Sequence, residues 1–343
     1  MQSSGRTTPR RLRGSRLEGS LPNGVRFTIG SGSPTHPPLA WRMTSLRLRS
    51  GGKSTGRPFA NKVVAVTGAG SGIGRALSYA FAERGADLAL NDINSAAVIE
   101  TSDGVRARGQ QATYKVFDVT DATEFIAFAH EAVAAYGRVD ILVNNAGVLS
   151  RFAPFSDQSA HEFGQCFTVN FSGVVNGSRA FLPYLLDRTE AWLINLSSSY
   201  AFLATPLQSP YVAAKFAIRG FTDVLRYELL KSNVRVLCVH PGGVKTNLGA
   251  NAPAADENER LHNAELQRLG FLATPEHVAV RIVRGVEQGR ARVVIGLDVH
   301  LFDISSRFLP VSYQKLILPL LRRLDPRMVE AMDALARGVR AGP

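Results

Sequence analysis

The stretch KVVAVTGAGSGIGR, residues 62–75, decides the fold, because a short apolar β-branched run changes into glycines and then into residues at helical spacing. This order predicts a strand, a tight turn and a helix. The glycines lack the Cβ atoms that would keep the backbone away from a bound phosphate, and the N–H groups that begin the helix would point at it. The stretch favours a nucleotide-binding turn, although an ordinary strand-to-helix turn would also use glycine.

Composition sets the limits of the interpretation. A chain of 343 residues that is 45% hydrophobic can bury a large core, in one α/β domain or two. Cys166 and Cys238 cannot build a disulfide framework, and neither they nor the seven histidines have metal-ligand spacing, so we predict no metal. The net charge of +12 falls mainly on residues 1–57, which hold eleven Lys or Arg and one acid. The rest carries only +2, which argues against nucleic-acid binding.

Residues 1–57 are rich in Ser, Gly, Pro and Arg without apolar periodicity, which predicts a disordered basic leader. They contain no apolar core of the kind a secretory signal needs. Their Arg-rich, Ser-rich and acid-poor composition matches an organelle transit peptide. Alternatively, translation begins at Met43 and residues 1–42 are a start-site artefact. We expect a cytoplasmic enzyme with an overlong start, and keep organelle targeting as the alternative.

From residue 58 to residue 299 the pattern alternates between β-rich apolar runs and helical stretches, which predicts a parallel sheet covered by helices on both faces. Ligands of such sheets bind beyond the carboxyl ends of the strands. The predicted strands cover residues 62–67, 87–91, 113–117, 139–144, 191–196, 234–240 and 292–295. The predicted helices cover residues 72–84, 94–108, 121–136, 158–187, 209–232 and 275–289.

Acidic residues follow the second and third strands. Asp92 lies about twenty residues after the glycines, where a carboxylate accepts hydrogen bonds from an adenosine ribose and repels a 2′-phosphate. No base stands beside it, and Ser71 occupies the turn position where a base would neutralise that phosphate, so NAD is favoured over NADP. Asp92 could instead cap the next helix. Asp118 could face an adenine or form a turn, whereas Asp121 is the better helix cap.

Amides and small residues follow the fourth strand, at Asn144-Asn145-Ala146-Gly147. Small residues permit a close approach of backbone to ligand, but Asn and Gly are also ordinary turn residues. Both interpretations remain open from the residues alone.

Three residues carry the predicted chemistry. Tyr211 and Lys215 stand at i and i+4, on one face of a helix, and an ammonium beside a phenol favours the phenolate, which would lower the tyrosine pKa from about 10. Ser198, thirteen residues earlier, could hold a substrate oxygen beside that phenol. The chain also contains a control, because Tyr227 and Lys231 have the same spacing but no hydroxyl thirteen residues earlier. We interpret that second pair as solvent-facing.

Taken together, these motifs closely resemble the short-chain dehydrogenase/reductase family over residues 59–297. They are Thr67-Gly68-x-x-x-Gly72-x-Gly74, Asn144-Asn145-Ala146-Gly147, Ser198, Tyr211-x-x-x-Lys215 and Pro241-Gly242. The resemblance implies a single doubly wound Rossmann fold of seven strands in the order 3-2-1-4-5-6-7. It also implies an NAD(P)-dependent oxidoreductase acting on alcohols or ketones.

The resemblance also assigns roles to residues. Tyr211 would be the catalytic acid/base, Lys215 would bind the nicotinamide ribose, Ser198 would orient the substrate, and Asn170 would hold a proton-relaying water. Pro241 to Thr246 would wrap the nicotinamide. The full set expected to bind the cofactor is Gly68, Ser71, Gly72, Ile73, Gly74, Asp92, Asp118, Val119, Asn145, Ala146, Gly147, Tyr211, Lys215, Pro241, Gly242, Val244 and Thr246.

Substrate specificity in this family lies in the loops after strands four to six. An apolar set in the first two favours a lipophilic secondary alcohol or ketone: Leu149, Phe152, Phe155, Tyr200, Phe202, Leu203 and Leu207. The alternative is that several of these pack beneath the loops. Residues 248–271 are expected to form a lid, and residues 300–343 an amphipathic extension for subunit packing or peripheral membrane contact. We expect a homodimer or homotetramer. An NADPH-linked carbonyl reductase and a non-catalytic nucleotide-binding regulator are the competing functions.

Overall fold

The computed structural model describes residues 17–20, 26–29, 57–249, 251–254, 256–257, 260–261, 273–315, 318–319, 329–330 and 333. The chain divides into two compact units, Met1–Gly52 and Lys53–Pro343. In the first, where no regular structure is expected, β1 (Leu17–Ser20) pairs antiparallel with β2 (Arg26–Ile29). Such a two-stranded ribbon is marginally stable by itself. Most of the predicted lid and most of the chain after residue 315 lie outside the described residues.

The second unit contains a seven-stranded, wholly parallel sheet in the order β5-β4-β3-β6-β7-β8-β9. Numbered along this unit, the order is 3-2-1-4-5-6-7, so the predicted Rossmann fold is confirmed. The strands are β3 (Val63–Thr67), β4 (Asp87–Asp92), β5 (Ala112–Val116), β6 (Ile141–Asn144), β7 (Ala191–Leu196), β8 (Val234–Pro241) and β9 (Arg292–Ile295).

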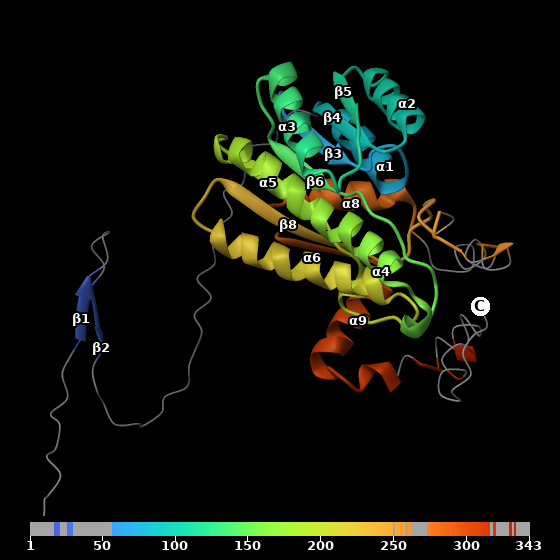
Figure 1. Cartoon of the computed structure of the whole chain (residues 1–343). Coiled ribbons are helices and arrows are strands. Elements are labelled where there is room, and N and C mark those ends of the chain that lie inside the picture. The colour runs from blue at the N-terminus through green and yellow to red at the C-terminus, as the bar shows by residue number, and fades with distance from the viewer. Residues whose placement is uncertain are drawn as a thin grey trace, which may run out of the picture. The chain divides into compact units, whose positions relative to one another are not determined.

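Helices cover both faces of this sheet, with α5 and α6 in front of it and α8 behind it in Figure 1. Two short 3-10 turns, η1 (Phe155–Asp157) and η3 (Ser199–Ala201), lie in the loops after β6 and β7. The helices are α1 (Gly72–Ala82), α2 (Ser95–Arg106), α3 (Ala122–Tyr136), α4 (Ala160–Phe167), α5 (Gly173–Leu186), α6 (Ser209–Glu228), α8 (Pro275–Glu287) and α9 (Leu297–Phe308).

The central strand β3 shows how the sheet builds two cores. All five of its residues are buried, as expected for a parallel strand covered on both faces. Val64 and Val66 pack into the core beneath α1 and α8, whereas Val63 and Ala65 pack into the core beneath α3 and α5. Successive side chains of a strand point to opposite faces, so one short apolar run contributes to both cores.

Four details differ from the sequence predictions or resolve their alternatives. The helix expected over 158–187 is interrupted by a π-helical turn, η2 (Thr168–Ser172), between α4 and α5. Asn94, not Asp92, caps α2, because its side chain accepts a hydrogen bond from the Ala97 N–H, so the cap hypothesis for Asp92 is wrong. Asp121 caps α3 as predicted. The boundary expected between residues 299 and 300 falls inside α9.

Candidate active site

A cleft of about 440 Å³ opens at the carboxyl ends of the strands, where ligands of such sheets bind. Every residue assigned above to catalysis or cofactor binding lines it, apart from Gly74. The lining residues so predicted are Gly68, Ser71, Gly72, Ile73, Asp92, Asp118, Val119, Asn145, Ala146, Gly147, Asn170, Ser198, Tyr211, Lys215, Pro241, Gly242, Val244 and Thr246. The fold thus brings together residues that lie up to 178 positions apart in the sequence.

The glycine turn forms one end of the cleft. Gly68 and Gly72 adopt φ of +61° and +50°, a left-handed conformation that glycine adopts without a steric penalty. Gly74 has another role, because a Cβ there would collide with the carbonyl oxygen of Gly68. The absent side chain lets α1 begin directly against the turn, and this places the first N–H groups of the helix toward the cleft.

The amides after β6 stabilise the strand ends, as the structural alternative proposed. Asn145 donates from Nδ2 to the carbonyl oxygens of Thr67 (2.9 Å) and Gly68 (3.1 Å), and the Thr67 hydroxyl accepts from the Asn145 backbone N–H (3.0 Å). Asn144 is buried and donates to Asn195 Oδ1 across 2.9 Å. Since the amides are engaged in this way, they position the backbone that lines the cleft.

The carboxylate of Asp92 lies beside the glycine turn. Its Oδ2 accepts from the Gly70 N–H at 2.8 Å, and its Oδ1 accepts from the Asn94 N–H at 2.9 Å. Arg75 follows the glycine turn, and its guanidinium binds the Gly70 carbonyl oxygen and Glu100. Lys215, at the other end of the cleft, is the only Arg or Lys among the described lining residues. No described cation therefore neutralises Asp92 within the cleft.

The catalytic candidates meet where α6 passes the end of β7. Lys215 donates from Nζ to the Leu196 carbonyl oxygen at 3.1 Å, and the Ser197 hydroxyl donates to the Lys215 carbonyl oxygen at 2.8 Å. Nζ lies 5.2 Å from the centre of the Tyr211 ring, and the Ser198 side chain lies close enough to Tyr211 to lower the pKa of its phenol. These contacts bring Ser198, Tyr211 and Lys215 together in one buried cluster. In contrast, Tyr227 is 83% exposed, as predicted for the control pair.

Burial controls the protonation of this cluster. It raises the pKa of Tyr211, an effect that the neighbouring Ser198 side chain only partly opposes. It also lowers the pKa of Lys215 to about 8. The predicted depression of the Tyr211 pKa is therefore not found in this structure, because burial disfavours the charged phenolate. Lys215 nevertheless keeps most of its charge at neutral pH.

Asn170 lies in the π-helical turn η2 and is completely buried. Its Nδ2 donates to the carbonyl oxygens of Val148 and Cys166, both at 2.8 Å. Its Oδ1 has no hydrogen-bond partner among the described residues and faces Gly147, where a Cβ would lie 2.6 Å from that oxygen and 3.5 Å from Lys215 Nζ. A buried acceptor without a partner is costly, so this oxygen marks a place for a donor beside Lys215.

Most of the apolar loop residues do not line the cleft, and two of them pack beneath the loops, as the alternative proposed. Of the seven, only Leu149 lines the cleft, together with Val148 and Leu248. Phe202 is buried against His240, with ring centres 4.4 Å apart, and Leu203 is buried against Tyr313. These two side chains pack beneath the loop because residues of the C-terminal segment bury them. The residue types of the loop alone did not indicate these partners.

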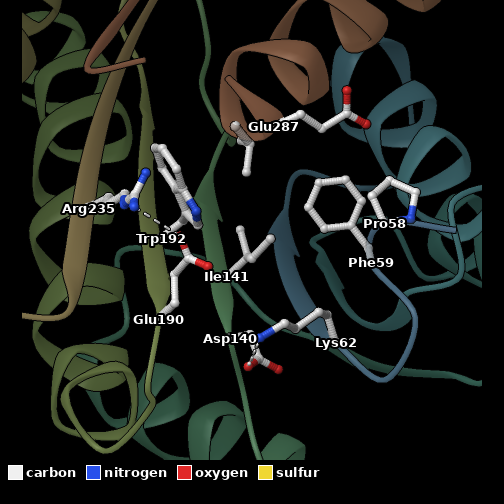
Figure 2. Close-up of a pocket in the computed structure, with 10 residues that line it drawn as sticks. Pro58, Phe59, Lys62, Asp140, Ile141, Glu190, Trp192, Arg235 and Glu287 are labelled. Carbon is white, nitrogen blue, oxygen red and sulfur yellow. Dashed lines mark hydrogen bonds and ion pairs between the residues drawn. The ribbon is translucent and has the colours of Figure 1, made fainter. Parts of the chain in front are cut away.

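A second cavity, of about 240 Å³, lies at the amino-terminal ends of the strands (Figure 2). Trp192 and Ile141 line it together with charged side chains that pair with one another. Lys62 lies 3.3 Å from Asp140, and Arg235 lies 3.3 Å from Glu190. The pairing satisfies these charges, and no residue predicted to be catalytic contributes to this cavity.

Two features are absent from the described part of the chain. No group of three or more His, Cys, Asp or Glu side chains is arranged to hold a metal ion. No helix there combines the length and the apolar character that crossing a membrane requires.

Comparison with known proteins agrees with this geometry. The model of the short chain dehydrogenase family matches residues 62–257. SadH of Mycobacterium tuberculosis, named as an oxidoreductase, is 41% identical over 262 residues, 76% of this chain and 95% of that protein. A Burkholderia phymatum short-chain dehydrogenase/reductase in complex with NAD superposes with a TM-score of 0.66 at 27% identity, covering 76% of this chain and 96% of that one.

An alcohol dehydrogenase from Thermococcus sibiricus, complexed with 5-hydroxy-NADP, superposes with a TM-score of 0.58 at 27% identity, covering 68% of this chain and 94% of that one. The fold, the cleft and these matches lead to one assignment. The chain belongs to the short-chain dehydrogenase family of oxidoreductases.

Proposed function

We propose that this protein transfers a hydride between NAD(H) and a neutral secondary alcohol or ketone, with Tyr211 as the acid/base. The observation that carries the proposal is the buried cluster of Ser198, Tyr211 and Lys215 in the wall of the cleft. A phenol in this position can exchange a proton with a substrate oxygen, and the Ser198 hydroxyl can hold that oxygen.

The residues of the cleft fit a nicotinamide dinucleotide. The turn at Gly68 to Gly72 would hold the pyrophosphate, Asp92 the adenosine ribose, and Lys215 the nicotinamide ribose. When bound, NAD supplies the hydride acceptor for alcohol oxidation. We favour NAD over NADP because the Asp92 carboxylate has no described cation in the cleft to offset its repulsion of a 2′-phosphate. The neighbours hold both cofactor types, so this preference depends on Asp92.

The remaining polar groups support proton movement. Lys215 places a positive charge beside the phenol, which favours transfer of the phenolic proton to a developing alkoxide. Asn170 offers its unpartnered Oδ1 on the side of Lys215, where a water would connect the ammonium to the cleft. These roles match those that the family resemblance implied.

The substrate we propose is lipophilic, as the sequence suggested, but the residues that support this proposal are not the ones predicted from the sequence. Val148, Leu149 and Leu248 are apolar side chains of the cleft, and Lys215 is already engaged with the Leu196 carbonyl oxygen. An uncharged substrate suits such a wall better than a sugar or an acid. We also propose a homo-oligomeric enzyme, since the outer face of α6 exposes Phe216 and Val224.

A turnover screen tests the proposal. Purified protein would be assayed by NADH absorbance with cyclohexanol, menthol and their ketones, and with glucose and lactate as polar controls. We expect turnover of the lipophilic pair with NAD(H), and its loss in Tyr211→Phe. Absence of turnover across the panel, with NADH binding unaffected by Tyr211→Phe, would instead support a non-catalytic nucleotide-binding regulator.

A further inference from the structure

We propose that Tyr313 is a positioning residue, which holds the segment 199–204 beside the catalytic tyrosine and so helps to determine which substrates bind. The inference rests on the proposed function and extends it to a part of the chain that the family match, ending at residue 257, does not cover.

The segment 199–204 begins directly after Ser198 and includes η3. The ring of Tyr200 lies edge-on to the ring of Tyr211, with centres 5.7 Å apart. The segment therefore borders the place where a substrate bound to Tyr211 and Ser198 would extend. A shift of this segment would move Ser199 and Tyr200, which lie next to the cleft residues Ser198 and Tyr211, while Tyr211 itself remains on α6.

Tyr313 contacts this segment from the C-terminal part of the chain. Its hydroxyl oxygen accepts a hydrogen bond from the Ala204 N–H at 3.2 Å. Its ring is buried in a small apolar cluster with Leu203 and Phe302. A backbone N–H bound to a buried phenol is fixed in both position and direction, so Tyr313 determines where the end of the segment lies.

A second connection joins α9 to the same segment. The ring of Phe202 lies under the guanidinium of Arg292, 4.6 Å from its carbon, and Arg292 forms an ion pair of 2.8 Å with Asp303 on α9. Asp303 is also paired with Arg307. Two connections from residues 292–313 thus hold the segment, at Phe202 through Arg292 and at Ala204 through Tyr313, in addition to the bond from Arg219 on α6 to the Ala201 carbonyl oxygen.

Another set of contacts fixes the catalytic cluster. Lys215 bonds to Leu196, and the Ser198 carbonyl oxygen lies 3.2 Å from His240 Nδ1. Since these contacts do not involve Tyr313, loosening the segment should weaken substrate binding more than it slows the chemical step.

The test compares Tyr313→Phe with the wild type, each saturated with NADH. The variant keeps the ring but loses the acceptor for Ala204. Hydrogen exchange measured by mass spectrometry should become about tenfold faster over 199–204, the effect of losing roughly one hydrogen bond. Phe308→Ala is the matched control, because Phe308 lies in the same C-terminal part and is 80% exposed. Exchange that is unchanged in Tyr313→Phe, or equally faster in Phe308→Ala, would overturn the proposal.

Kinetics then test the role in specificity. In Tyr313→Phe the KM for cyclohexanone should rise about fivefold, with kcat within about twofold and the NADH Kd unchanged. Equal loss in kcat and NADH affinity would indicate general destabilisation and contradict the assignment. Asp303→Asn weakens the connection from Phe202 through Arg292 to α9 without changing Tyr313, and it should also raise the KM for cyclohexanone. If wild-type protein turns over no alcohol or ketone, the proposed function fails, and the exchange experiment still decides the positioning role.

Discussion

The backbone N–H of Gly70 donates a hydrogen bond to Oδ2 of Asp92 across 2.8 Å, which ties the glycine turn to the end of β4. The carboxylate is therefore fixed beside the place where a dinucleotide would turn from its pyrophosphate to its adenosine ribose. In this position Asp92 would discriminate between cofactors by its charge.

Asp92→Asn should reverse the cofactor preference. The variant retains an acceptor for the Gly70 N–H but removes the negative charge, so repulsion of a 2′-phosphate is relieved and a charged hydrogen bond to the ribose is lost. We expect the ratio of NADPH to NADH affinity to rise about 100-fold, measured by fluorescence titration of both cofactors. Asp121→Asn is the control, because Asp121 caps α3 outside the cleft. An unchanged ratio in Asp92→Asn would disprove the role of Asp92.

Tyr211→Phe should lower kcat by about 10³-fold, because the phenol is the only acid/base group proposed to touch the substrate oxygen. Thermal unfolding and NADH binding should stay close to wild type, since the ring remains buried. Tyr227→Phe supplies an internal control on the same helix, with the same YxxxK spacing and an exposed side chain, and should leave kcat unchanged. Comparable kcat values for the two variants would argue against catalysis by Tyr211.

The rate of ketone reduction should fall as pH rises above about 8. Burial lowers the pKa of Lys215 to about 8, so the ammonium loses its proton through this range and no longer favours release of the Tyr211 proton. The measurement is kcat/KM for cyclohexanone with saturating NADH between pH 6 and pH 10. In Lys215→Arg the charge persists, and the decline should move to higher pH. A profile that is flat through pH 10 would refute the assignment.

His240 should make the protein less stable in acid. Burial lowers its pKa from 6.5 to about 3 in the folded state, so below pH 6.5 the unfolded chain binds a proton that the folded chain does not. Its stabilising contribution is complete above pH 6.5 and is lost as pH falls toward 3, by at most about 1.4 kcal/mol per pH unit. Denaturant unfolding at several pH values should give a shallower dependence for His240→Asn. Identical slopes would show that other groups dominate.

Local sequence patterns predicted the sheet well, because each strand is a short apolar run whose neighbours in the chain are helical. They predicted the glycine turn for the same reason. Asn170 shows where such reasoning stops. Its side chain faces inward only because η2 inserts a π-helical turn between α4 and α5, and helical periodicity counted at 3.6 residues cannot reveal that insertion. Resemblance to a family supplied the residue, and the structure supplied the physical reason.

Phe202 and Leu203 show a second limit. Both looked like substrate contacts because they follow a catalytic strand and are apolar. They are buried instead by partners about ninety to one hundred and ten positions later, Arg292, Phe302 and Tyr313. A long-range partner of this kind leaves no mark on the local pattern. The prediction of a lowered Tyr211 pKa was wrong for a related reason. The i, i+4 spacing indicates that Lys215 lies beside the phenol, but it does not show how deeply Tyr211 is buried.

The bond from Lys215 Nζ to the Leu196 carbonyl oxygen, together with that from Ser197 to the Lys215 carbonyl oxygen, joins α6 directly to the end of β7. The chain between Ser198 and Tyr211 therefore does not determine how far apart those two side chains lie. Loops of other lengths and compositions could replace residues 201–208, which follow the Tyr200 N–H that holds the Ser198 hydroxyl, while the reacting groups keep their places. For protein engineers, the residues that perform the chemistry and the loop that helps to select the substrate can then be changed independently within one domain.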